Sequence, residues 1–111
     1  METQIKKNYQ IEAVQNDGTT VIYVHSDNKW ELDEHVLSCH VGDNYLYETL
    51  KNAEDDIDMA KETFFEQHKN CLGFYKEIRI TENTNTLTKE DDEEFEYTDF
   101  ENKIVKRYIV K

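Results

Sequence analysis

Two pairs of histidine and cysteine residues have side chains that could bind a metal ion. His35 lies four residues before Cys39, which His40 follows directly. In the second pair, His68 lies three residues before Cys71. Two imidazoles and two thiolates are a ligand set that zinc binds tetrahedrally. The chain has no Cys-x2-Cys spacing, however, and Cys71 falls on an apolar stripe where a core thiol is expected. We therefore predict two plain thiols, no metal site and no cofactor, with zinc and a Cys39–Cys71 disulfide as the alternatives.

Motifs for catalysis are missing from the sequence. Ser26 and Ser38 are the only serines, and neither lies in a Gly-x-Ser-x-Gly motif. Three glycines form neither a phosphate-binding P-loop nor a Gly-x-Gly-x-x-Gly turn. An Asp-Asp-x-Asp run at residues 55–58 could attract a divalent cation, but it lacks the glycine and the final glutamate of a calcium loop. We predict that the protein is not an enzyme.

The elements that position these residues are predicted from hydrophobic periodicity. Alternation predicts strands at residues 9–14 and 20–25, and the Asn-Asp-Gly-Thr sequence at 16–19 predicts a tight turn between them. Residues 30–41 fit either a short helix or a strand, and we favour a strand or an irregular segment. The first part of the chain is therefore expected to form a β-hairpin.

A long amphipathic helix is predicted next. From Leu46 to Cys71 apolar residues recur every three or four positions, which places them on one stripe of a helix. We expect this helix at residues 44–70, capped by the Gly-Asp-Asn sequence at 42–44 and ending near Gly73. Its length would be about 40 Å, which is long for a domain of 111 residues.

After the helix, the pattern predicts strands again. Residues 74–81 alternate, and so do 95–100 and 104–110, whereas 82–94 show no apolar period and are expected to form a mobile acidic loop. The predicted fold is a single acidic α+β domain over residues 1–111, with the order β-β-(β)-α-β-β-β. One long amphipathic helix packs across an antiparallel sheet of four to five strands.

Charge is the most informative property of the sequence. The chain has 25 acidic and 13 basic residues, a formal net charge of -12. Such a balance argues against direct binding of nucleic acid or of an anionic membrane. Residues 81–101 hold nine acids and one base, and further acids are predicted on the helix face opposite the apolar stripe. The residues expected to bind a basic partner are Asp55, Asp58, Glu62, Glu66, Glu93, Glu94 and Glu96.

In composition, acidic and without proline, the chain is similar to small phage-encoded inhibitors and anti-defence proteins, although no motif is shared. We expect a non-enzymatic viral protein of this kind, which binds a host nuclease or nucleic-acid-binding protein as a DNA mimic. Bacterial immunity proteins that neutralise basic toxins have a similar composition and are one alternative. The other alternative is a structural or assembly component whose charge serves only solubility.

We expect no targeting signal either. The first ten residues contain no apolar segment of the kind found in signal peptides, and the longest apolar run, residues 21–24, is far too short to span a membrane. Two cysteines fit a reduced protein better than a disulfide framework. We expect a cytoplasmic protein, in the host cytoplasm if it is phage-encoded.

Overall fold

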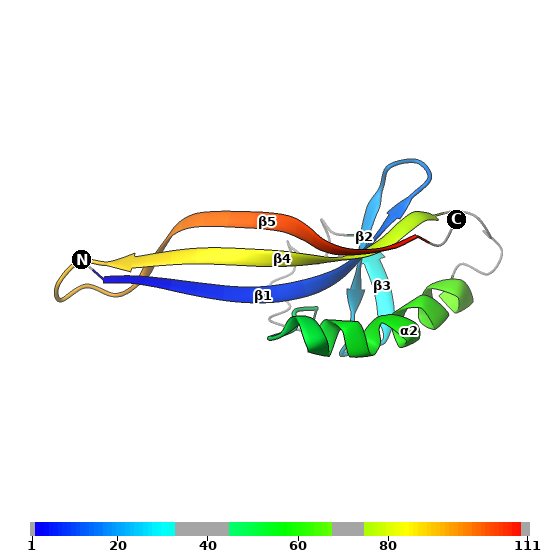
Figure 1. Ribbon diagram of the computed structural model, residues 1–111, viewed down its shortest axis with the longest axis horizontal. Coiled ribbons are helices and arrows are strands. Elements are labelled where there is room, and N and C mark those ends of the chain that lie inside the picture. Colours follow the sequence, from blue (N-terminus) through cyan, green and yellow to red (C-terminus); the bar gives the residue numbers. More distant parts are fainter. Residues whose placement is uncertain (1, 33–44, 68–74, 110–111) are drawn as a thin grey trace.

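Five strands form one antiparallel sheet in the computed structural model, which describes residues 2–32, 45–67 and 75–109. The strands are β1 (Glu2–Gln15), β2 (Thr20–Val24), β3 (Lys29–Leu32), β4 (Tyr75–Lys89) and β5 (Glu96–Ile109). Their order in the sheet is β3-β2-β1-β4-β5, and helix α2 (Leu50–Gln67) packs across one face (Figure 1). The predicted α+β class is therefore confirmed, as is the helix across an antiparallel sheet.

Tight turns join the first three strands, as the sequence predicted for the first hairpin. Gly18 adopts a φ of 91°, a left-handed conformation that costs glycine little, and the Asp17 carboxylate accepts a 2.9 Å hydrogen bond from the Thr19 amide. Asn28, before β3, also has a positive φ. Its side-chain oxygen accepts hydrogen bonds from the hydroxyls of Tyr23 and Thr63, so that this turn is tied to α2.

The apolar stripe of α2 packs on the sheet as predicted. Leu50, Ala53, Ile57, Ala60 and Phe64 contact a core that includes side chains of all four strands from β1 to β4. The expected start of the helix was wrong. Residues 45–49 are not helical, because Tyr47 pairs with Tyr9 of β1 through two main-chain hydrogen bonds of 2.7 and 2.8 Å.

Thr49 is the residue that caps α2. Its hydroxyl accepts a 3.1 Å hydrogen bond from the amide of Asn52, which satisfies one of the free amides of the first turn. Residue 44 and residues 68–70, where we expected the two helix ends, lie outside the described residues. In the part of the chain that the structure describes, no helix is long and apolar enough to cross a membrane.

Residues 82–94 differ most from the predicted structure. We expected a loop, but β4 continues to Lys89 and only residues 90–95 connect it to β5. This part of β4 pairs with β1 on one side and with β5 on the other. Main-chain hydrogen bonds to both neighbours therefore stabilise the strand, although its sequence has no apolar face. The two strands expected at 95–100 and 104–110 are one strand, whose alternation is interrupted by register shifts opposite Ile80/Thr81 and Thr86/Leu87.

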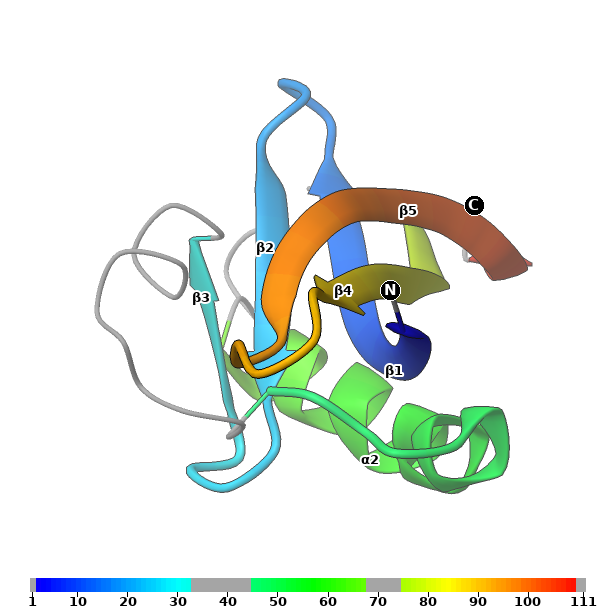
Figure 2. The same ribbon diagram turned by 90° about the vertical axis from the view of Figure 1, so that its left-hand side faces the viewer.

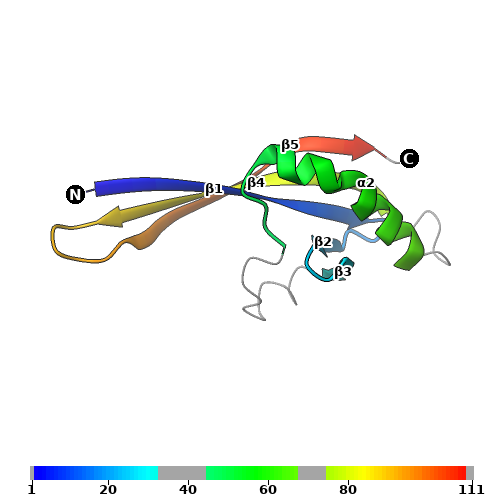
Figure 3. The ribbon, with the colours of Figure 1, turned by 90° about the horizontal axis from the view of Figure 1, so that it is seen from below.

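The three long strands extend well beyond the helix and the short strands. The molecule measures 56 × 25 × 24 Å, and α2, β2 and β3 lie at one end of its long axis (Figures 1 and 3). We call the other end the arm: residues 2–7 of β1 and residues 84–101 of β4, the turn and β5. Seen along the long axis, β5 curves over the sheet on the side away from α2 (Figure 2).

Candidate functional site

The arm carries a dense acidic surface. Every residue from 90 to 101 is exposed, and none of the twelve is basic. Within the described residues, no ion pair joins these carboxylates to a lysine or arginine. The acids of this segment, which we call the acidic tract, are Glu90, Asp91, Asp92, Glu93, Glu94, Glu96, Asp99 and Glu101. Eight carboxylates thus face solvent in twelve residues, where a cationic surface could reach them.

Exposed aromatic rings lie among these acids. Tyr97 is 73% exposed and Phe100 is 59% exposed. The register of β5 separates the two kinds of side chain: Tyr97 pairs with Leu87 on the face away from α2, whereas Asp99 pairs with Thr86 on the helix side. Strand β5 therefore presents its carboxylates on the helix side and these aromatic rings on the other face.

The acids predicted on the helix form a separate group. Asp55, Asp58, Glu62 and Glu66 are all exposed on α2, opposite its apolar stripe as expected. Helix α2 lies along the half of the molecule away from the β4–β5 turn, which contains Glu93 and Glu94 and leads into Glu96 (Figures 1 and 3). The structure therefore does not bring the seven predicted partner-binding residues onto one surface.

A charged cluster lies where the arm meets the core, on the helix side. The Tyr9 hydroxyl donates a 2.9 Å hydrogen bond to Glu82, and the ammonium groups of Lys7 and Lys103 lie 3.6 and 3.5 Å from the same carboxylate. The bond from Tyr9 and the two ammonium groups lower the pKa of Glu82, and the same bond raises the pKa of Tyr9. This cluster holds a buried carboxylate ionised at the base of the arm.

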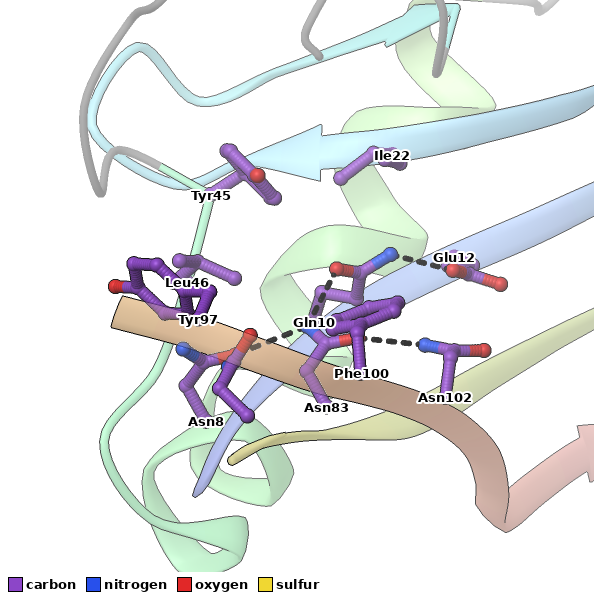
Figure 4. Close-up of a pocket in the computed structure, with 11 residues that line it drawn as sticks. Asn8, Gln10, Glu12, Ile22, Tyr45, Leu46, Asn83, Tyr97, Phe100 and Asn102 are labelled. Carbon is purple, nitrogen blue, oxygen red and sulfur yellow. Dashed lines mark hydrogen bonds between the residues drawn. The ribbon is translucent and has the colours of Figure 1, made fainter. Parts of the chain in front are cut away.

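Opposite the helix, the sheet carries a network of carboxamides (Figure 4). The side-chain nitrogen of Asn83 donates to both Asn8 and Gln10 at 2.9 Å, and the oxygen of Asn83 accepts from Asn102 at 2.7 Å. Gln10 in turn donates to the carboxylate of Glu12. Gln10, Glu12 and Asn83 are each less than 10% exposed, so polar groups replace the apolar residues that usually fill such a position.

These side chains line a pocket of about 420 Å³. Besides the five network residues just named, the lining contains Ile22, Tyr45, Leu46, Asn85, Tyr97 and Phe100. This site was not predicted, because the first strand was expected only at residues 9–14 and a loop at residues 82–94, which left Asn8 and Asn83 outside any strand. One sequence feature could have indicated the strand: asparagine and threonine alternate at residues 83–86. Alternation of this kind is typical of a strand when a partner strand is available to pair with it.

The proposed metal ligands lie in other parts of the chain. His35, Cys39, His40, His68 and Cys71 are outside the described residues, so the zinc and disulfide alternatives stay untested. Among the residues that the structure describes, no three His, Cys, Asp or Glu side chains gather as metal ligands would. In the Asp-Asp-x-Asp run, Asp56 accepts a 2.8 Å hydrogen bond from the Tyr47 hydroxyl.

Comparison with known proteins gives no relative. No family model matches the chain, and neither a curated protein nor a solved structure is significantly similar to it.

Proposed function

We propose that the protein is a small, acidic, non-enzymatic inhibitor that occupies the basic surface of a host nuclease or nucleic-acid-binding protein. One observation carries this proposal: all eight carboxylates of the acidic tract are exposed and no base lies among them. A surface kept only for solubility usually mixes charges of both signs. The composition supports a phage-type, anti-defence role in the host cytoplasm.

Spacing supports imitation of nucleic acid by the arm. Residues two apart on a strand, such as Asp99 and Glu101, lie about 6.7 Å apart on the same face. One strand of duplex DNA presents a phosphate about every 3.4 Å along the helix axis. The β5 acids therefore match roughly every second phosphate, and the acids of the turn add further charge at one end.

The two faces of the arm would contribute differently to binding. Carboxylates attract a basic surface over a distance and accelerate encounter. Tyr97 and Phe100 offer exposed apolar area, and aromatic anchors often supply much of the affinity in protein interfaces. The arm thus combines long-range attraction with short-range contact, and the acids of α2 form a second, smaller acidic surface.

Charge reversal tests the proposal. The partner is first captured from host lysate and identified by mass spectrometry, and its binding is then measured with purified proteins at increasing salt. We expect binding to weaken steeply with salt, because exposed charges are screened over a Debye length of about 8 Å at physiological ionic strength. Duplex DNA should compete, and a variant with Glu93→Lys, Glu94→Lys and Glu96→Lys should associate at least tenfold more slowly.

A matched triple reversal on α2 is the control: Asp58→Lys, Glu62→Lys and Glu66→Lys. It changes the net charge equally but leaves the arm intact, so we expect a smaller effect on association. A larger effect than that of the arm variant would place the contact on the helix. Binding that ignores salt, both triple variants and excess DNA would contradict the proposal and favour an assembly component. A nuclease toxin encoded beside this gene would indicate an immunity protein instead.

A further inference from the structure

The pocket on the face away from α2 has a polar floor and apolar walls. Its floor comes from β1 and β4, the central pair of the sheet, and consists of the carboxamide network around Gln10 and Asn83. Ile22 and Tyr45, which pack together, line it on the β2 side. Tyr97 and Phe100 line it on the β5 side (Figure 4). The result is a slot between two walls that both contain aromatic rings.

The hydrogen-bonding groups that remain in the slot include both donors and acceptors. Both amide hydrogens of Asn83 are used within the network, and its oxygen accepts one hydrogen bond there. Four side-chain atoms make no hydrogen bond with any described residue: the amide nitrogen of Asn8, the oxygen of Asn102, and the nitrogen and oxygen of Asn85. A ligand that offered only donors or only acceptors would leave part of this set unpaired.

The charges of the described residues around the slot do not favour an ionic ligand. The one ionisable group on the floor is Glu12, whose carboxylate is held by Arg79 through two contacts of 3.0 Å and by Thr81 at 3.3 Å. Arg79 already neutralises it, so no free negative charge is left on the floor for a cation. No lysine or arginine lines the slot, among the described residues, to receive a phosphate. The ligand that fits is uncharged.

We infer that the slot binds a neutral, planar heterocycle of the nucleobase class, as a free base or nucleoside. The edge of a base carries adjacent donors and acceptors, which asparagine and glutamine side chains recognise in pairs. Its flat faces stack on aromatic rings, as single bases do in many nucleic-acid-binding proteins. The volume of about 420 Å³ lies within the range of small-molecule sites. A nucleic-acid chain is excluded because its phosphates would be repelled by a protein of charge -12.

This site uses none of the carboxylates that we propose to bind a basic partner. It depends on β1, β4 and the aromatic face of β5, whereas the contact with a basic partner depends on the acids of the turn and of the other face. Only Tyr97 and Phe100 belong to both surfaces. A bound base would cover these two rings, so ligand binding and partner binding would compete for them without sharing any carboxylate.

Titration with nucleosides tests the inference. Adenosine, guanosine, cytidine and uridine are added to the full chain and followed by calorimetry and by NMR of the side-chain amides of Gln10, Asn83, Asn85 and Asn102. We expect at least one nucleoside to bind with a Kd below about 1 mM and to shift these amide signals. Adenosine triphosphate should bind no more tightly than adenosine, because the slot provides no cation for the phosphates.

Two variants and one control locate the site. Phe100→Ala removes a stacking surface from an exposed position and should weaken binding about 5-fold or more. Asn85→Ala should weaken it as well, by removing a donor and an acceptor. Phe95→Ala removes an aromatic ring from the same arm outside the slot and should leave the Kd unchanged. The inference is overturned if no nucleoside binds at millimolar concentration, if glucose or galactose binds instead, or if Phe95→Ala weakens binding as much as Phe100→Ala.

Discussion

The indole nitrogen of Trp30 donates a 2.9 Å hydrogen bond to the main-chain carbonyl of Ala60, so a side chain of β3 fixes the position of α2. One turn further along the helix, Phe64 packs edge-on against the same indole, with ring centroids 5.3 Å apart. The ring centroid of Tyr23 lies 5.4 Å from that of Trp30. Aromatic pairs in these geometries add to the stabilisation that burial alone provides. The three rings form the centre of the core between helix and sheet.

Removal of the Phe64 ring should therefore be costly. Phe64 is 1% exposed, and Phe64→Ala should lower the free energy of unfolding by about 3–5 kcal/mol, because it leaves a cavity beside Trp30. Glu62→Ala, on the solvent face of α2, should change it by less than about 0.5 kcal/mol. Chemical denaturation of the two variants makes the comparison. The opposite ranking would show that the helix packs in a different register.

The pair Glu12–Arg79 gives a second stability prediction. Arg79→Met leaves a carboxylate that is 8% exposed without its cation, and loss of one partner of a buried pair costs about 3–5 kcal/mol. We expect the low end of that range, because the Arg79 side chain is itself 22% exposed. Arg107→Met removes a more exposed arginine, 3.6 Å from Glu77, and should cost less than about 1 kcal/mol. Urea denaturation distinguishes the two, and equal losses would mean that the Glu12 pair is not buried in solution.

The sequence predicted the core much better than the arm. The stripe from Leu50 to Phe64 and the turn at Gly18 depend on local patterns, namely a period of three to four and an Asp-Gly pair, and both were predicted correctly. Residues 82–89 have no such local signal. Their strand exists because β1 and β5 pair with it on both sides, and pairing between distant segments cannot be derived from the periodicity of one segment.

The candidate sites show the same contrast between features that depend on local sequence and features that depend on the assembled sheet. Exposure of Asp58, Glu62 and Glu93 was predicted from their positions, because a run of acids is almost always solvated. Their separation into two groups was not, since it depends on how far β4 and β5 extend beyond the helix. The slot around Asn83 depends on the register that places Asn8, Gln10 and Asn102 beside it, and that register appears only in the assembled sheet.

Glu82 makes the stability of the protein depend on pH. Its pKa is lowered in the folded state, chiefly by the hydrogen bond from Tyr9, so the ionised form favours folding. This contribution is complete above the ordinary pKa of 4.5 and is lost as the pH falls through the lower, folded-state pKa. Glu82→Gln keeps the shape but removes the charge. The stability difference between the native protein and this variant should therefore be largest near pH 7 and shrink below about pH 4.5.

The matched control for this prediction is Glu93→Gln, in the exposed turn. This substitution changes the same chemical group at a position with no ion pair among the described residues. The stability of the Glu93→Gln variant should therefore depend on pH in the same way as that of the native protein. Denaturant midpoints measured from pH 3 to pH 7 provide the comparison. A difference between native protein and Glu82→Gln that stays constant over this range would rule out the carboxylate as its source.

The arm should open more readily than the rest of the sheet. In residues 84–89 of β4 only Leu87 is buried, whereas Ile78 and Ile80 of the same strand lie in the core under α2. Main-chain hydrogen bonds are present along the whole strand, but burial of apolar groups differs sharply between its two halves. Local opening free energies follow such differences, so amides with few buried neighbours exchange through small fluctuations and core amides only through global unfolding.

Hydrogen exchange followed by NMR should therefore show protection at least tenfold lower at Thr84, Thr86 and Thr88 than at Ile78 and Ile80. Equal protection along β4 would mean that the arm unfolds only with the core and is a rigid extension of it. If lower protection is found, a partner or ligand that contacts the arm should raise it at these threonines and leave the core amides unchanged.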